Sequence, residues 1–138
     1  MIPTLYCLMR EDLQDLNPGK AMAQAMHAQA DFDAWVERLE PDNILLSYVN
    51  VWKEDRSFGR TLVVSVTLEQ IKHFVCDIAL FQRIGPRTSG ITVDPTYPWR
   101  NFYGKVFLTN EITCAWAFAC DATPQAQIDW LKSQSLHQ

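Results

Sequence analysis

The chain has 138 residues, of which 48% are apolar, 20% are charged and 12% are aromatic. This composition excludes a disordered chain, and the length predicts one domain, residues 1–138, with a core that needs no metal or disulfide. No stretch of the sequence approaches the roughly 20 apolar residues of a membrane span, and no leader pattern is present, so we expect a cytoplasmic protein without membrane contacts. The four cysteines form no CxxC pair and predict reduced core thiols.

The net charge of −4 is unevenly distributed along the chain. Residues 53–105 carry eight basic and five acidic side chains, whereas residues 1–52 carry three basic and eight acidic ones. A polyanionic partner is therefore compatible with the sequence if the middle bases gather on one face of the fold, since phosphate contacts depend on local charge. A mixed, solvated surface is the alternative.

The first half of the chain predicts a strand, a helix and a segment that fits several structures. Residues 4–9 form a β-prone apolar run that predicts a strand buried on both faces. Asn17 is a good helix cap and Pro18 suits the first helical position, so an alanine-rich helix is expected from there to about Leu39. Residues 42–58 fit an edge strand, a helical turn or an insertion into the domain.

The second half alternates strand and helix signals. Thr67 and Gln70 have the spacing of a capping box and predict a helix from there to about Gln82. Asp94-Pro95 is typical of a turn and should end the strand before it. The other predicted elements are strands at 60–66, 90–94 and 112–119 and a helix at about 124–133.

The order of these elements favours an α/β domain in which helices cover both faces of a largely parallel sheet. The connection between Asp94 and Ile112 is unusually aromatic for a linker. It could bind a partner, or it could fold back as a lid over the core.

Three polar residues share one face of the first predicted helix. Lys20, Gln24 and His27 are spaced at i, i+4 and i+7 among alanines and methionines. Lys20 adds positive charge to the first helical turn, which already favours an anion such as a phosphate or a developing oxyanion. A solvent-facing stripe on a surface helix explains the pattern equally well.

Two further residues are candidates on weaker grounds. Asp94 ends a strand at the sheet edge where α/β proteins commonly bind ligands, although an aspartate before proline is more often a turn residue. Thr113 places a lone hydroxyl in an apolar strand, where it is usually a packing residue. No zinc, P-loop, GxGxxG or GxSxG pattern is present, so neither a metal nor another cofactor is expected.

Taken together, these motifs resemble the type-2 peptidyl-tRNA hydrolases. The resemblance rests on the strand at 5–9, a charged turn with Asp12, and Gly19-Lys20-x-x-Ala23-Gln24-x-x-His27-Ala28. It continues through the strand at 62–66, the helix start at 67–69, the strand that ends in Asp94, and Thr113 at the opening of the next strand. It covers most of the chain except residues 42–58 and the segment near 97–105.

The resemblance implies a three-layer α/β fold with a mixed, mostly parallel sheet of about four strands between helices, frequently as a homodimer. It also implies metal-independent cleavage of the ester that joins a peptide to tRNA. The family's Asp-Ala-Gly turn is here Asp94-Pro95-Thr96, its later threonine is Pro98, and its Gly-Pro after the last core strand is absent. A relative with these changes could keep the fold and lose the reaction.

The leading hypothesis is therefore an esterase that acts on peptidyl-tRNA or a similar acylated tRNA. Asp94 would orient or deprotonate a water, Lys20 and the amides at the helix N-terminus would stabilise the oxyanion, and Thr113 would position the substrate. The predicted substrate-binding residues are Gln24, His27, Arg83, Arg87 and Arg100, the three arginines through phosphates. The alternative is a catalytically inactive domain of the same fold that binds a small ligand, RNA or a protein through residues 95–103.

Overall fold

A computed structural model of the chain describes residues 1–14, 16–55, 59–76 and 87–137. Its elements are β1 (Thr4–Arg10), α1 (Pro18–Glu37), α2 (Ile44–Glu54), β2 (Arg60–Val66), α3 (Leu68–Cys76), β3 (Ser89–Arg100), β4 (Val106–Ala119) and α5 (Gln125–Ser133). None of the helices in these ranges is long and apolar enough to cross a membrane.

The four strands form one mixed sheet in the order β2-β1-β4-β3. β1 pairs in parallel with β2, but β1 with β4 and β3 with β4 are antiparallel. The expectation of a mostly parallel sheet is therefore wrong, while the expected four strands and mixed character are present. The difference arises because β3 and β4 form a hairpin and are therefore antiparallel. In the sequence, the two predicted strands at 90–94 and 112–119 were separated by a long connection.

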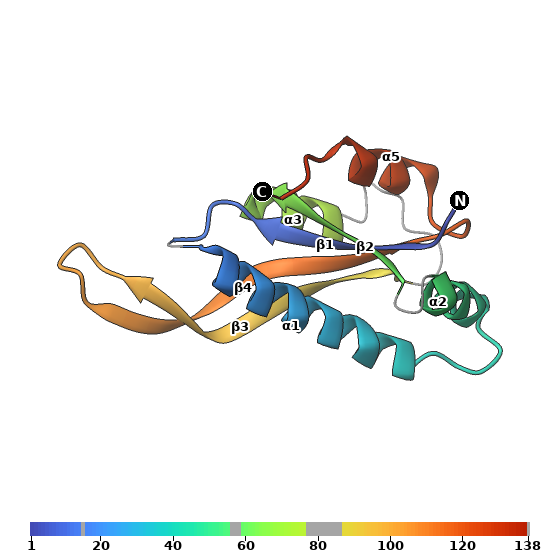
Figure 1. Ribbon diagram of the computed structural model, residues 1–138, viewed down its shortest axis with the longest axis horizontal. Helices are drawn as coiled ribbons and strands as arrows, with labels where there is room; N and C mark the ends of the chain where they lie inside the picture. Colours follow the sequence, from blue (N-terminus) through green and yellow to red (C-terminus); the bar gives the residue numbers. More distant parts are fainter. Residues whose placement is uncertain (15, 56–58, 77–86, 138) are drawn as a thin grey trace.

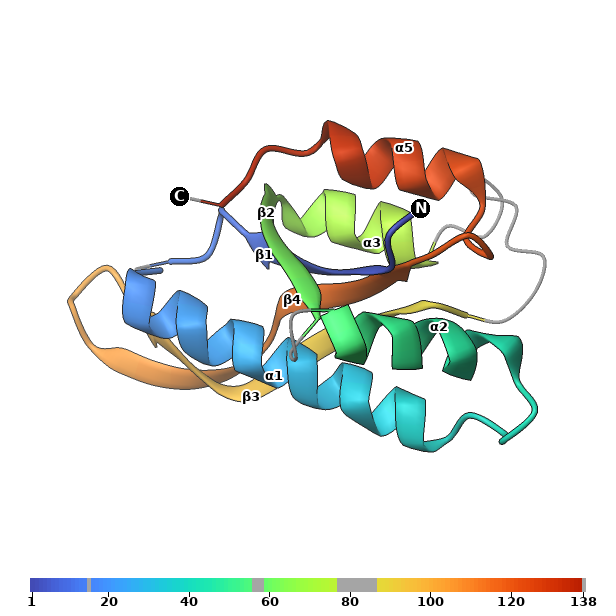
Figure 2. The same cartoon turned by 45° about the vertical axis from the view of Figure 1, so that its right-hand side comes forward.

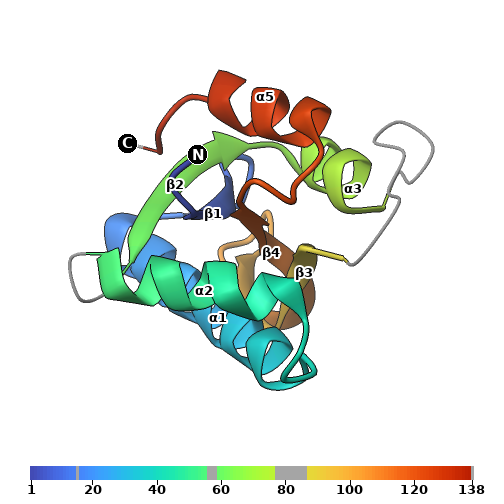
Figure 3. The same cartoon turned by 90° about the vertical axis from the view of Figure 1, so that its right-hand side faces the viewer.

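Helices lie against both faces of this sheet, with α1 and α2 on one side and α3 and α5 on the other (Figures 1 and 3). Alternate side chains of β1 enter the two cores, since Leu5, Cys7 and Met9 pack with α1 and α2 while Tyr6 and Leu8 pack with α3 and α5. This two-sided burial explains why the β1 sequence is apolar at every position.

The capping interactions that were predicted at the starts of two helices are present in the structure. The Asn17 side chain accepts a hydrogen bond from the Lys20 amide at 2.9 Å, and Pro18 begins α1. At the start of α3, Thr67 and Gln70 each accept a hydrogen bond from the other's amide, as a capping box requires. Residues 77–82, where this helix was expected to continue, lie outside the described residues.

The segment 42–58, for which three structures had fitted, contains a helix. Asn43 caps α2, and Leu45, Val49 and Trp52 are buried at helical spacing against α1 and the sheet. β-branched residues give the segment strand propensity, but burial of this apolar face decides the outcome.

β3 continues through Pro95 and Pro98 to Arg100, so the expected turn at Asp94-Pro95 is wrong. β3 is an edge strand with a neighbouring strand on one side only. A proline, which has no N–H group, is therefore tolerated there, because no strand on the free side needs that hydrogen-bond donor. Instead of a loose loop or lid, the aromatic segment forms the outer half of the β3–β4 hairpin, which extends beyond the N-terminal end of α1 (Figure 2). Thr113 consequently lies inside β4 and does not open it.

Three of the four cysteines are buried free thiols, but Cys76 is exposed, so the prediction of a core position is wrong for that residue. A hydrogen bond with Cys114, together with burial, raises the pKa of Cys7. Cys7 therefore remains a protonated packing residue at neutral pH.

The residues after α5 return to the sheet and cover the free side of β2. The Ser65 amide donates to the Ser135 carbonyl at 2.9 Å, and the His137 amide donates to the Val63 carbonyl at 2.8 Å. Leu136 thereby forms an antiparallel bridge with Val64.

Gly59 lies between α2 and β2, directly against the ring of Trp52, and this close contact gives a prediction about stability. Its φ is +81°, and an added Cβ would lie 2.2 Å from Trp52 Cε2, in a ring fixed by a 2.7 Å hydrogen bond from Nε1 to the Arg60 carbonyl. We expect Gly59→Ala to lower the free energy of unfolding by more than about 2 kcal/mol, measured by urea denaturation. Gly104→Ala is the matched control, because Gly104 has the same φ with open space around it. Equal losses in the two variants would contradict the steric account.

Candidate functional site

The candidate site lies where the N-terminal half of α1 crosses β3 and β4. Gln24 is its centre: the side chain is buried and joins residues that are 70 and 89 positions away in the sequence. Its Nε2 donates to Asp94 Oδ2 at 2.8 Å, and its Oε1 accepts from Thr113 Oγ1 at 2.5 Å. The structure thus brings three of the predicted site residues into one hydrogen-bonded chain.

Two irregularities in the β3–β4 pairing place these side chains. Thr92 pairs with Cys114 and Val93 with Ile112, so Thr113 is an extra residue on β4. A bulge of this kind interrupts the alternation of the strand and re-aims a side chain. It explains how the hydroxyl of Thr113 and the thiol of Cys114 can both bond to Gln24, the thiol through the Gln24 carbonyl at 3.3 Å.

The second irregularity follows Asp94. Asp94 pairs with Glu111 and Tyr97 with Thr109, so Pro95 and Thr96 together face one residue of β4. Thr96 folds back onto Asp94: its amide and hydroxyl donate to Oδ1 at 2.8 and 3.1 Å. Asp94 is therefore held on both oxygens.

These contacts determine the protonation of Asp94. Partial burial by itself would raise the pKa of this carboxyl group, but the hydrogen bonds from Gln24 and Thr96, with a smaller effect of His27, together lower it below its usual value. Asp94 is thus ionised at neutral pH, and its basicity is weak. This state suits a carboxylate that orients a water molecule or a hydroxyl better than a strong general base.

Glu111 lies directly opposite Asp94 and would repel it if its charge were not compensated. Arg10 Nη1 contacts Glu111 Oε2 at 3.1 Å, and Trp99 Nε1 donates to Oε1 at 3.0 Å. Arg10 also donates to the Ile112 carbonyl at 2.9 Å, which anchors β4 to the end of β1.

Lys20 lies one helical turn before Gln24, with its Nζ 5.6 Å from the ring centre of Tyr97. Tyr97 is fully buried, and its hydroxyl donates to the Gln14 carbonyl at 2.9 Å. The ammonium group is thereby directed toward β3 three residues beyond Asp94. The amide of Lys20, by contrast, is occupied by the Asn17 cap, so it cannot serve as the oxyanion donor that the hypothesis assigned to the helix N-terminus.

The remaining predicted residues are dispersed. His27 is exposed on α1 and acts on Asp94 only through its charge. Arg87 precedes β3 and Arg100 ends it, so roughly 40 Å of extended chain separates them. The structure therefore does not bring these two predicted phosphate-contact residues together, and Arg83 lies outside the described residues.

Sequence reasoning missed Gln14, which ties the hairpin to the β1–α1 connection. Its Nε2 donates to the Arg100 carbonyl at 2.6 Å, and its Oε1 accepts from the Arg100 amide. No signal in the sequence marks this glutamine, because its partners depend on the path of β3.

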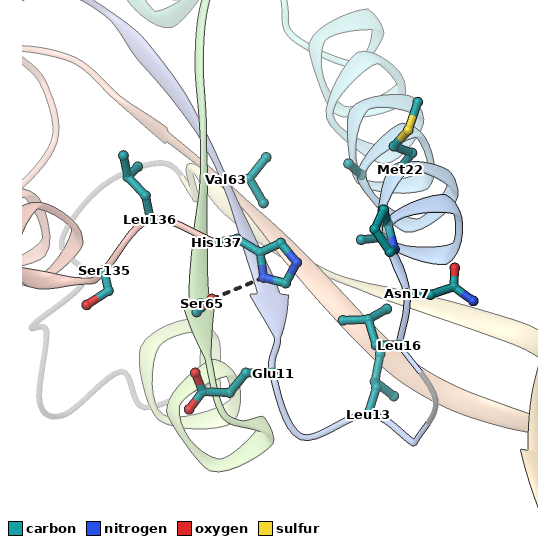
Figure 4. Close-up of a pocket in the computed structure, with 13 residues that line it drawn as sticks. Glu11, Leu13, Leu16, Asn17, Met22, Val63, Ser65, Ser135, Leu136 and His137 are labelled. Carbon is teal, nitrogen blue, oxygen red and sulfur yellow. Dashed lines mark hydrogen bonds between the residues drawn. The ribbon is translucent and has the colours of Figure 1, made fainter.

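A separate cavity of about 740 Å³ lies between the N-terminal part of α1, β2 and residues 135–137 (Figure 4). Pro18, Ala21 and Ala25 of α1 line it, whereas none of the five candidate residues on α1, β3 and β4 does. Ser65 Oγ and His137 Nδ1 form a 3.0 Å hydrogen bond at its wall. The cavity is therefore distinct from the Gln24 cluster, and sequence spacing did not indicate it.

Comparison of the chain with models of known protein families and with curated proteins finds no match. Among the described residues, no group of three histidine, cysteine, aspartate or glutamate side chains is arranged to hold a metal ion.

The Gln24–Thr113 hydrogen bond gives a testable coupling energy. Thr113→Val keeps the side-chain shape but leaves Gln24 Oε1 without its buried donor, so we expect a loss of about 1 to 3 kcal/mol in unfolding free energy. In a double-mutant cycle with Gln24→Met, the coupling should be about 1 kcal/mol. Thr61→Val, at an exposed position of β2, is the control and should change stability little. Additive losses at positions 24 and 113 would contradict the contact.

The lowered pKa of Asp94 predicts a pH dependence of stability. Because the folded-state pKa lies below the unfolded value of about 3.9, the contribution of Asp94 is present above that pH and is lost as the pH falls through the folded-state pKa. The unfolding free energy of the wild type should therefore rise more steeply between about pH 3 and 5 than that of Asp94→Asn. Urea denaturation across this range is the measurement, and parallel curves would refute the shift.

Proposed function

We propose that the protein is a peptidyl-tRNA hydrolase-like esterase that cleaves the ester between a peptidyl, or N-blocked aminoacyl, group and tRNA. The observation that carries the proposal is the Gln24 cluster, in which Asp94 of β3 and Thr113 of β4 bond to one side chain of α1. All three residues are among the positions at which the chain resembles the type-2 peptidyl-tRNA hydrolases.

In this proposal Asp94 orients the attacking water through its ionised carboxylate. The water adds to the ester carbonyl, the carbon–oxygen bond to the ribose breaks, and the water's proton passes to the ribose oxygen. Lys20 stabilises the negative charge that develops on the carbonyl oxygen. A cation held over the Tyr97 ring, one helical turn from Gln24, is suited to that role.

Thr113 and His27 have indirect roles. Thr113 is completely buried and donates to Gln24, so it positions that amide and does not touch the substrate. His27 favours the ionised form of Asp94. Gln24, with its side chain also buried, holds Asp94 in place.

The wider parts of the proposal follow the same resemblance. Helices on both faces of the sheet support a three-layer domain. We place its action in the cytoplasm, on the acylated 3′ end of tRNA and without a cofactor, and we expect a homodimer, which sedimentation would detect.

One observation favours the second candidate, a catalytically inactive binding domain. Both oxygens of Asp94 already accept hydrogen bonds from the protein, three in total, which weakens the carboxylate as a base. The inactive domain would bind its partner without turnover, and Asp94→Asn would change binding little.

Hydrolysis of an N-acetylated aminoacyl-tRNA separates the two candidates. We expect Lys20→Ala to lower the rate about a hundredfold, the magnitude typical of losing one group that stabilises an oxyanion. Asp94→Asn should lower it at least tenfold. Lys72→Ala, an exposed lysine on α3 across the sheet, is the matched control and should keep the wild-type rate. Release by the wild type at no more than the Lys20→Ala rate would reject the esterase.

A further inference from the structure

The outer half of the β3–β4 hairpin, residues 97–109, is the most exposed apolar part of the described chain. We call this segment the arm. Phe102 and Tyr103 at its tip are 97% and 90% exposed, and Val106, Phe107 and Leu108 follow them on the exposed surface of β4. Figure 1 shows the arm extending away from the helices that cover the rest of the sheet. Side chains of this size are seldom exposed together without a partner.

The tip holds its aromatic residues in a defined conformation. Asn101 Oδ1 accepts from the amides of Tyr103 and Lys105 at 3.0 and 2.9 Å, and the Asn101 and Gly104 amides close the turn. Gly104 adopts a φ of +81°, which the turn requires. The exposed rings are therefore presented by an ordered turn, at a low entropic cost of binding.

The two rings at the tip provide separate stacking surfaces. Phe102 and Tyr103 lie 5.6 Å apart between ring centres, with an interplanar angle of 87°. They make an edge-to-face contact with each other, so they do not cover one another's faces as stacked rings would. Each leaves a face available to a planar group such as a nucleobase.

The charge of the arm is positive, in contrast to that of the whole chain. Arg100 and Lys105 flank the tip, and no acidic residue occurs between Asp94 and Glu111. Lys105 Nζ lies 5.3 Å from the ring centre of Phe107, so cation and aromatic surfaces are interleaved. Although the chain has a net charge of −4, the only charged side chains of the arm are basic. The arm's basic and aromatic side chains together complement a polyanion that carries planar groups.

The arm is also continuous with the candidate site. Tyr97 lies under the Lys20 ammonium, and the strand runs from there to the tip over about 15 Å. Gln14 fixes this path by its contacts with Arg100. A single-stranded nucleic acid with bases stacked on the tip could therefore extend along β3 toward Lys20 and Asp94.

We propose that the arm binds single-stranded RNA, with unpaired bases stacked on Phe102 and Tyr103 and phosphates near Arg100 and Lys105. On the proposed function, on which this assignment rests, the strand is the unpaired 3′ end of the acylated tRNA. The arm then determines the substrate class by selecting a flexible end over a base-paired stem.

The test uses a fluorescently labelled, unacylated RNA oligonucleotide with the sequence of a tRNA 3′ end, with binding followed by anisotropy. We expect Phe102→Ala/Tyr103→Ala to weaken binding about tenfold or more, since each stacked base contributes strongly. The matched control is Ile44→Ala/Val51→Ala, which removes two exposed apolar side chains from α2 and should not change binding. A base-paired RNA of equal length should bind the wild type more weakly than the single strand does.

A second measurement examines the cations. Lys105→Gln should reduce the slope of log binding constant against log salt by about 0.7, the value for one phosphate contact on a single strand. Binding that is unaffected by the double substitution at the tip, or no RNA binding by the wild type, overturns the proposal. Binding of the arm to lipid vesicles or to a second copy of the chain in place of RNA also overturns it.

This measurement is independent of hydrolysis, because the probe carries no ester. A protein that binds the strand through the arm but releases no acyl group would retain the arm assignment and lose only the proposed esterase activity. If hydrolysis depended on Lys20 but RNA binding did not depend on the arm, the esterase activity would be retained and the arm assignment would be lost.

Discussion

The buried amide of Gln24 is the interaction on which the candidate site depends. Its two hydrogen bonds and the thiol contact to its carbonyl fasten α1 to both strands of the hairpin. An amide that is buried without such partners would cost about 1 to 3 kcal/mol, so the three residues stabilise one another's positions. The same contact lowers the pKa of Asp94 and aligns the helix face that carries Lys20. The position of Asp94, its ionised state and the orientation of α1 thereby all depend on the Gln24 side chain.

Much of the fold could be predicted because its signals are local. The Asn17-Pro18 start, the capping box at Thr67 and the apolar strand at 60–66 each depend on neighbours within a few residues. The helix at 44–54 could have been found from the Asn43 cap and the spacing of Leu45, Val49 and Trp52. There the β propensity of individual residues obscured the period of burial.

The site was predictable in its residues and unpredictable in its geometry. Spacing on one helix face identified Gln24 and Lys20, yet the sequence contains no sign of the bulge that turns Thr113 toward α1. The strand that continues through Pro95 could not be anticipated either, because a proline is tolerated there only on account of the neighbour that β3 lacks. Such features depend on pairing between distant segments, and the position of Gln14 beside Arg100 is a consequence of them.

Residues 135–137 pair with β2, so β3 is the free edge of the described sheet, apart from the two contacts of Gln14 with the Arg100 backbone. A free sheet edge normally presents a row of backbone amides to which a strand of another chain can hydrogen-bond, and such pairing leads to fibrils or domain-swapped oligomers. Pro95 and Pro98 lie along this one and offer no N–H, so a continuous ladder cannot form across that stretch. The two residues that obscured the strand in the sequence thus also protect the hairpin from assembling by edge-to-edge hydrogen bonding.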